Sequence, residues 1–358
     1  MKFKTIMKSA IAVVTVIMLP AGCRPAPPDP ATMREMKITV LVDNLGDLSY
    51  NDGIVREMRQ AGERYRESGA LDLSVNVFEM QTGTGNEKTE LESAFGADSE
   101  LIIIANQIGL PILEPAAAYY PEKRFILFDM EATGPNIYSA LFKPNEAAYL
   151  CGALAAKMSG AGMIGIVIGM EIPALHDFCV GYILGAQAVD SDCKVMVSAV
   201  GNFYDADMGY EAAAKQFERG ADVCFSAAGG AGLGCIKAAS DFGRFAIGVD
   251  IDQTEQVEAE LKNVILTSCL KNFDVLVAAM LDNYVAGTIK FGESGRYGLR
   301  EGAVGIARNQ YYTRMVPQNI RDEIDALEAK VSVGEAGVRS AFEMTQAEID
   351  ELFKSVRP

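Results

Sequence analysis

The stretch KITVLVD, Lys37 to Asp43, predicts a buried β-strand because aliphatic and β-branched residues dominate it. The polar segment NLGDLSYNDG, Asn44 to Gly53, follows it, and apolar residues then recur at helical spacing up to Ser68. A buried strand, a polar loop and an amphipathic helix in succession form the first half of a βαβ unit. The loop is either a plain turn or one wall of a binding site, with Tyr50 as its one aromatic residue.

This unit recurs along the chain in two similar sets. Strands are predicted at residues 37–43, 71–80, 101–105 and 125–129, and again at 163–169, 194–201, 223–227 and 245–250. The spacing of strand starts is similar in both sets, which indicates an internal architectural duplication. Further strands are predicted at 264–270 and 303–307. The pattern predicts an α/β protein of two lobes, each a parallel sheet flanked by helices.

The expected organisation divides the chain into four parts. Residues 1–22 form a signal peptide and residues 23–36 a proline-rich tether. Lobe I comprises residues 37–141 plus about 267–300, and lobe II comprises residues 142–266 plus about 301–358. The last helix is expected to begin with a capping box formed by Thr345 and Glu348.

The N-terminal segment has the features of an export signal. Three lysines precede an apolar run, Ala10 to Met18, that is too short to span a bilayer as a helix. The sequence LPAGC, Leu19 to Cys23, is similar to a bacterial lipobox, so Cys23 is the expected lipidation site. A plain signal peptide is the alternative. We expect an exported protein that is lipid-anchored to the periplasmic or extracellular face of the cell membrane.

Charge and cysteine content narrow the class of protein further. The chain has 48 acidic and 32 basic residues among 358, for a net charge of −16, which opposes binding to nucleic acid or to an anionic surface. Six cysteines follow Cys23, and none has the spacing of a zinc site or a C-x-x-C pair. We expect them to be free, buried thiols, although one disulfide remains possible. No metal or cofactor is expected.

Acidic residues end several of the predicted strands. Asp43, Asp129 and Asp250 lie at strand carboxyl ends, where ligands bind in open α/β sheets. Each of them could instead cap a following turn or helix. The glycine run AGGAGLG, Ala228 to Gly234, follows a strand but lacks the G-x-G-x-x-G spacing of a dinucleotide site. Its glycines would still allow a ligand to approach the backbone closely.

Ordered blocks of sequence resemble a known family, and the resemblance covers roughly residues 37 to 335. The blocks are NLGDLSYNDG, FKPNEAAYLCG (Phe142 to Gly152), IGIVIGMEIP (Ile164 to Pro173), ADVCFSAAGGAGLG (Ala221 to Gly234), AIGVDIDQ (Ala246 to Gln253), ILTSCLK (Ile265 to Lys271) and GLREGAVG (Gly298 to Gly305). They resemble the basic membrane protein family of exported lipoproteins, the purine-nucleoside-receptor-type substrate-binding proteins of ABC transporters. The resemblance implies the type I periplasmic-binding-protein fold, a nucleoside ligand and a permease partner, and no enzymatic activity.

The resemblance also implies roles for particular residues. Tyr50, where the family usually has Phe, and Phe225 would clamp the base between their rings. Asp43, Asn44 and Asn51 would bond the base or sugar edges, and Asp129 and Asp250 would hold the ribose hydroxyls. Gly229 and Gly230 would allow the ligand to pack closely on the backbone, and Lys271 would donate a hydrogen bond to an acceptor on the ligand. Because acids outnumber Lys271 there, a neutral nucleoside is expected to bind better than a nucleotide.

Three alternatives remain open from the sequence. The same clamp could bind another solute, such as a sugar or a small aromatic molecule. The protein could be a nucleoside hydrolase or an oxidoreductase, although His176 is the chain's one histidine and no catalytic motif accompanies it. It could also be an adhesin or a sensor that has kept the fold and changed its partner.

Overall fold

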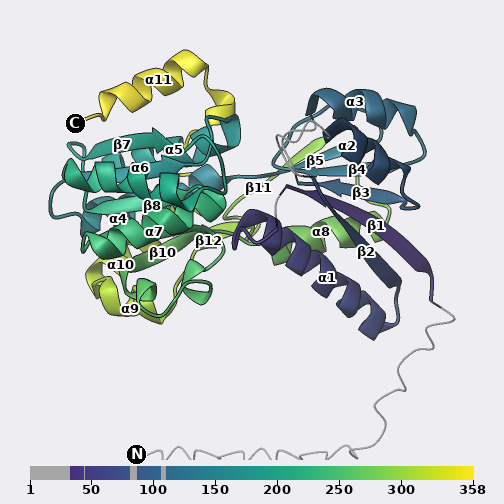
Figure 1. The fold of residues 1–358 in the computed structure, drawn as a ribbon, viewed down its shortest axis with the longest axis horizontal. Helices are drawn as coiled ribbons and strands as arrows, with labels where there is room; N and C mark the ends of the chain where they lie inside the picture. Colours follow the sequence, from purple (N-terminus) through teal and green to yellow (C-terminus); the bar gives the residue numbers. More distant parts are fainter. Residues whose placement is uncertain (1–32, 44, 81–86, 106–109) are drawn as a thin grey trace, which may run out of the picture.

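The computed structural model describes residues 33–43, 45–80, 87–105 and 110–358. The predicted signal peptide, Cys23, most of the predicted tether and Asn44 therefore lie outside the described residues. Two lobes lie side by side and are joined near the middle of the molecule (Figure 1). Each lobe is built on one six-stranded sheet.

The two sheets have the same strand order, which confirms the predicted duplication. The first sheet runs β11 (Ser294–Tyr297), β5 (Ile137–Phe142), β4 (Arg124–Phe128), β3 (Leu101–Ile104), β1 (Glu35–Val42) and β2 (Asp72–Glu79). The second runs β12 (Val304–Ile306), β10 (Ile265–Lys271), β9 (Phe245–Asp250), β8 (Val223–Ala227), β6 (Met163–Ile168) and β7 (Lys194–Ala199). Every pairing is parallel except that of β10 with β12.

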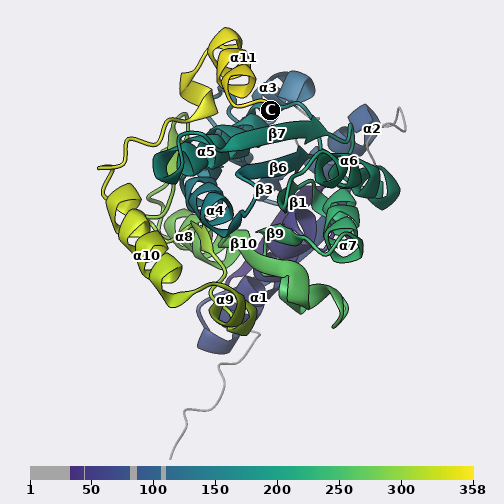
Figure 2. The same cartoon turned by 90° about the vertical axis from the view of Figure 1, so that its left-hand side faces the viewer.

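Helices cover both faces of each sheet, as the near-continuous apolar strands require. On the first sheet, α1 (Tyr50–Ser68) and α8 (Phe273–Val285) share one core, and α2 (Glu87–Gly96) and α3 (Leu110–Tyr119) share the other. On the second, α4 (Pro144–Met158) and α5 (Pro173–Val189) lie opposite α6 (Ala206–Glu218) and α7 (Gly232–Asp241) (Figure 2).

The C-terminal part of the chain belongs to the second lobe. It contains α9 (Gln310–Met315), α10 (Gln318–Ser332) and α11 (Gln346–Ser355), of which α10 contacts α4 and α11 contacts α5. The capping box predicted for the last helix is present, with the Thr345 hydroxyl accepting from the Glu348 backbone N–H.

The chain crosses between the lobes three times. It passes to the second sheet after Phe142, returns to the first lobe at α8, and crosses again between β11 and β12. Because β10 pairs with β9 through Leu270, the second crossing lies at Asn272 rather than near residue 267, where the sequence placed it. Hydrogen bonds tie the crossings together: the Asn272 N–H donates to the Ala303 carbonyl at 2.8 Å, and the Lys143 N–H donates to the Tyr297 carbonyl at 2.9 Å.

Candidate functional site

The carboxyl ends of strands from both sheets meet between the lobes. Asp129 directly follows β4, and Asp250 ends β9, the strand at the equivalent position of the second sheet. Both have left-handed backbone conformations, with φ of +56° and +63°. This region is unfavourable for most L-residues and is least so for Asn and Asp, so short acidic side chains suit both strand ends.

Lys271 connects these two aspartates. Its ammonium lies 2.5 Å from Asp129 Oδ2 and 3.9 Å from Asp250 Oδ1, and all three side chains are buried. Burial favours the neutral amine of Lys271, but the carboxylates of Asp129 and Asp250 outweigh burial, so the pKa of Lys271 is raised. Burial raises the pKa of Asp250, and Lys271 and Ser49 oppose that rise. The three groups therefore form one charge-coupled cluster, which we name the lysine–diaspartate cluster.

This cluster and its neighbours join the two lobes. Asp129 belongs to the first lobe and Lys271 to the second, and the Asp129 carboxylate also accepts from the Phe142 N–H at 3.0 Å. A second bond crosses the cleft, in which the Ser49 hydroxyl donates to Asp250 Oδ2 at 2.6 Å. The polar groups that the sequence assigned to ligand binding therefore hold the lobes together.

Aromatic rings surround the ammonium of Lys271. It lies 4.7 Å from the ring centroid of Tyr50, 5.2 Å from that of Phe178 and 5.5 Å from that of Phe142. These distances are within the range of cation–π contacts. The Tyr50 hydroxyl donates to the Phe128 carbonyl at 3.3 Å, which fixes the ring beside Asp129.

The loop before α1 is held by its own side chains. Asp47 accepts from the N–H groups of Ser49, Asn51 and Asp52 at 2.9–3.1 Å and so caps the first turn of α1. Asn51 braces the loop: its Oδ1 accepts from the Asp43 N–H at 3.1 Å, and its Nδ2 donates to Asp47 at 2.9 Å. Burial raises the pKa of Asp47 to about 6. The segment is therefore both a turn and, through Ser49 and Tyr50, a wall of the cleft.

Phe225 makes its ring contacts within the second lobe. It occupies the middle of β8 with no exposed surface, and its ring lies 5.8 Å from that of Phe178 and 5.4 Å from that of Tyr182. The structure thus places Phe225 in the core of the second lobe. Phe178, on α5, has its ring near both Phe225 and Lys271, and the sequence pattern did not single it out.

A second aromatic residue lies at the cleft edge of the second lobe. A Cβ added to Gly169, after β6, would lie 2.3 Å from the Phe203 ring, so this ring packs on the glycine. Gly229 has a φ of +56°, and a Cβ on Gly230 would lie 3.2 Å from the Phe203 carbonyl and 3.8 Å from Asp47 Cα of the other lobe. The glycine pair thus permits close approach of Phe203 and of the opposite lobe. The sequence feature that could have identified Phe203 as a cleft residue is its position just after the strand predicted at residues 194–201.

The other candidate groups named from the sequence are the cysteines and His176. Among the described residues no cluster of His, Cys, Asp and Glu could hold a metal ion. The six cysteines after Cys23 are free and buried, as predicted. His176 is buried in the first turn of α5, with Nε2 at 2.7 Å from Glu171. Within the described ranges, no helix combines the length and apolar character needed to cross a bilayer.

Comparison with known proteins agrees with this geometry. The family model described as "ABC transporter substrate-binding protein PnrA-like" matches residues 37–336. Basic membrane protein A of Borreliella afzelii is 28% identical over 303 residues, which cover 82% of this chain and 89% of that protein. The protein named ABC transporter nucleoside-binding protein BmpA, of Lactococcus lactis subsp. cremoris, is 27% identical over 353 residues, covering 93% of this chain and 99% of that one.

A solved structure supports the fold independently. The crystal structure of an ABC transporter solute-binding protein from Aeropyrum pernix K1 superposes with a TM-score of 0.75 at 23% identity, covering 90% of this chain and 97% of that one. Together, the duplicated two-lobed fold and the match over residues 37–336 show that the chain belongs to the family of PnrA-like ABC transporter substrate-binding proteins.

Proposed function

We propose that this protein captures a nucleoside, with a purine the preferred base, between its lobes and presents it to the permease of an ABC transporter. The lysine–diaspartate cluster carries the proposal. Two carboxylates from equivalent strand ends can accept hydroxyl hydrogen bonds from a pentose, and these are stronger than bonds between neutral groups. The neighbouring Tyr50 ring offers a stacking face.

Binding requires the lobes to separate and the bonds across the cleft to be exchanged. Ser49 then releases Asp250, and ribose hydroxyls take its place. The second lobe offers Phe178 and Phe203 as aromatic surfaces, with Phe225 beneath Phe178. Hinge motion at the three crossings is the type of closure known for two-lobed binding proteins. No reaction is catalysed, and no cofactor is used.

A lipid anchor on Cys23 would keep the receptor beside its permease. The proline-rich segment after Cys23 would act as a semi-rigid spacer between the membrane and β1. Labelling with a radioactive fatty acid tests this, because Cys23→Ser abolishes the label if Cys23 is the acceptor. Label retained in that variant contradicts the anchor.

The Tyr50 ring gives a direct test of nucleoside binding. Base–aromatic stacking contributes about 1–3 kcal/mol. We expect Tyr50→Ala to weaken adenosine or guanosine binding by about tenfold or more in titration calorimetry, and Tyr50→Phe to retain most of the affinity. Equal affinities for the wild type and Tyr50→Ala contradict the assignment. Tighter binding of a nucleoside monophosphate than of its nucleoside contradicts the expected preference for a neutral ligand.

A further inference from the structure

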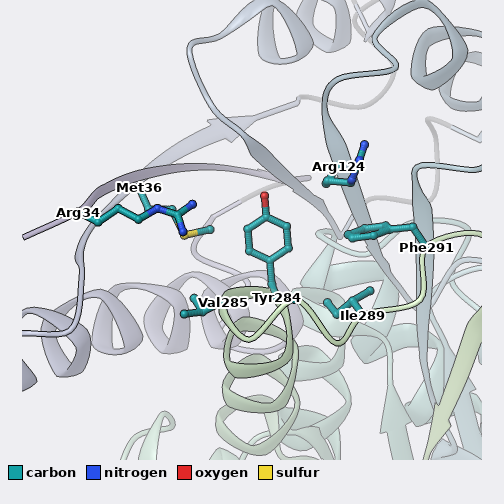
Figure 3. Close-up of a pocket in the computed structure, with 8 residues that line it drawn as sticks. Arg34, Met36, Arg124, Tyr284, Val285, Ile289 and Phe291 are labelled. Carbon is teal, nitrogen blue, oxygen red and sulfur yellow. The ribbon is translucent and has the colours of Figure 1, made fainter.

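A second pocket lies in the first lobe, at the edge of the sheet opposite the cleft. It has a volume of about 420 Å³ and is lined by the amino ends of β1 and β4, the end of α8 and the segment leading to β11. Its size is within the range of small-molecule sites. Figure 3 shows the lining side chains, with Tyr284 standing in the middle. Neither the cluster between the lobes nor the hinge crossings contribute to this pocket.

Two arginines and a phenol give the pocket its polar character. Arg34 enters from the start of β1 and Arg124 from the start of β4, on either side of the Tyr284 hydroxyl (Figure 3). The apolar lining comes from Met36, Val285, Ile289 and Phe291. Polar groups set among apolar side chains in this way can fix the orientation of a small molecule.

The two arginines are compensated to different degrees. Arg34 Nη2 lies 3.2 Å from both carboxylate oxygens of Glu100. Arg124 has no carboxylate within ion-pair distance in the described part of the chain, and its Nη1 donates to the carbonyls of Pro121 and Lys123 at 3.1 and 3.2 Å. Its guanidinium lies 5.4 Å from the centroid of Phe291. Arg124 therefore brings an uncompensated positive charge to the pocket.

The phenol of Tyr284 is available as a donor. Its ring packs edge-on against Phe291, with centroids 6.3 Å apart, and its hydroxyl makes no hydrogen bond to any residue that the structure describes. Burial, with Glu100, raises the pKa of Tyr284 against the opposing effect of Arg124 and Arg34, so the hydroxyl keeps its proton. A protonated phenol beside a guanidinium is suited to an anionic acceptor.

We propose that this pocket is a second binding site, for a small carboxylate or phosphate carried on an apolar, flat-ringed body. The anionic group is bound by Arg124 and the Tyr284 hydroxyl, and the apolar body lies against Met36 and Ile289. The carboxyl end of α8 also faces the pocket, and its partial negative charge opposes an anion beside Val285. The anion is therefore placed on the Arg124 side.

The site is separate from the proposed nucleoside site, so both can be occupied together. The chain has no tryptophan, so naphthoate is a suitable fluorescent probe for titration with the purified protein. We expect naphthoate to bind, neutral naphthylmethanol to bind at least tenfold more weakly, and inorganic phosphate, which lacks an apolar body, to compete only weakly. Saturating adenosine leaves naphthoate binding unchanged.

Matched variants assign the probe to this pocket. Arg124→Gln is expected to weaken naphthoate binding tenfold or more and Tyr284→Phe about threefold to tenfold. Arg357→Gln removes the same charge from an exposed position in the second lobe and is expected to leave binding unchanged. Circular dichroism and adenosine titration check that each variant is folded.

Four results would overturn the second site: no detectable naphthoate binding, equal binding of naphthylmethanol, displacement of naphthoate by adenosine, or unchanged affinity in both pocket variants. Failure of the nucleoside proposal gives a different pattern, because adenosine then fails to bind while the naphthoate results stand. Replacing naphthoate by naphthyl phosphate distinguishes the two anionic groups, and preferential binding of either supports the site.

Discussion

Replacing Lys271 by Met tests whether the lysine–diaspartate cluster is a buried, charge-coupled unit. The side chains of Lys271 and Asp129 are 6% and 7% exposed, and that of Asp250 is 8% exposed. Removal of the ammonium leaves two carboxylates in one buried site without their cation. Breaking a buried ion pair by removing one partner costs about 3–5 kcal/mol in unfolding free energy. For a chain of this size that corresponds to a fall in Tm of roughly 4–7 °C.

The chain contains a matched control at the surface. Lys237 and Asp241 form a Lys–Asp pair with the same 2.5 Å separation, but their side chains are 54% and 41% exposed. Lys237→Met should leave the unfolding free energy almost unchanged, because water screens this exposed pair. Urea unfolding followed by circular dichroism measures both variants. The comparison holds distance and residue type constant and varies burial.

The pH dependence gives the deciding result. Without Lys271, the pKa of Asp250, already raised by burial, rises further, so the folded variant binds a proton more tightly than the unfolded chain does. Stability that depends on a raised pKa is present at low pH and is lost as pH rises through the folded-state pKa. The deficit of Lys271→Met should therefore shrink as pH falls from about 7 to about 5. Adding Asp129→Asn should recover part of the loss at neutral pH. A deficit below about 1 kcal/mol, or one independent of pH, would refute a buried charge cluster.

Two further perturbations test other parts of the fold. A Cβ on Gly152 would lie 1.9 Å from the Tyr182 carbonyl oxygen, so Gly152→Ala should separate α4 from α5 and lower the unfolding free energy by about 3 kcal/mol or more. Gly96→Ala, where nothing lies within 4 Å, should have little effect, and equal urea midpoints for the two variants would contradict this packing. Because burial raises the pKa of Asp47 to about 6, the wild type should gain stability relative to Asp47→Asn as pH falls through that value. Urea unfolding at several pH values measures this, and the opposite trend would show that the capping hydrogen bonds dominate.

Most of the fold was predictable because it depends on local pattern. Buried parallel strands are near-continuous apolar runs, so the strands and the duplicated order followed directly from the sequence. The second crossing was placed too early because strand pairing decides it: β10 pairs with β9 through Leu270 before the chain turns at Asn272. Sequence alone gives no measure of how long that pairing continues.

The candidate site was predictable in part, for a related reason. Position at a strand end predicted Asp129 and Asp250 as cleft residues, and these residues do meet there. The mutual pairing of Asp129, Asp250 and Lys271 depends on contacts between lobes, which no local pattern reports. Asp43 remains a candidate ligand-binding residue because of its position after β1. The Asn51 side chain forms hydrogen bonds within the loop, to the Asp43 N–H and to Asp47. The position of the Phe225 side chain could not be predicted, because it depends on which helix packs on that face of the sheet. In the structure that helix is α5, through Phe178.

The duplication explains why one lysine serves two aspartates. Asp129 and Asp250 occupy equivalent positions, and so do Phe142 and Lys271, which end the neighbouring strands β5 and β10. A phenylalanine at both positions would leave two buried carboxylates without a cation, whereas one lysine between them compensates part of their charge. The two halves have diverged so that Lys271 lies between the aspartates, 5.5 Å from the Phe142 ring at the equivalent position. Divergence at this one pair of positions lets the two acidic strand ends approach closely when the lobes meet.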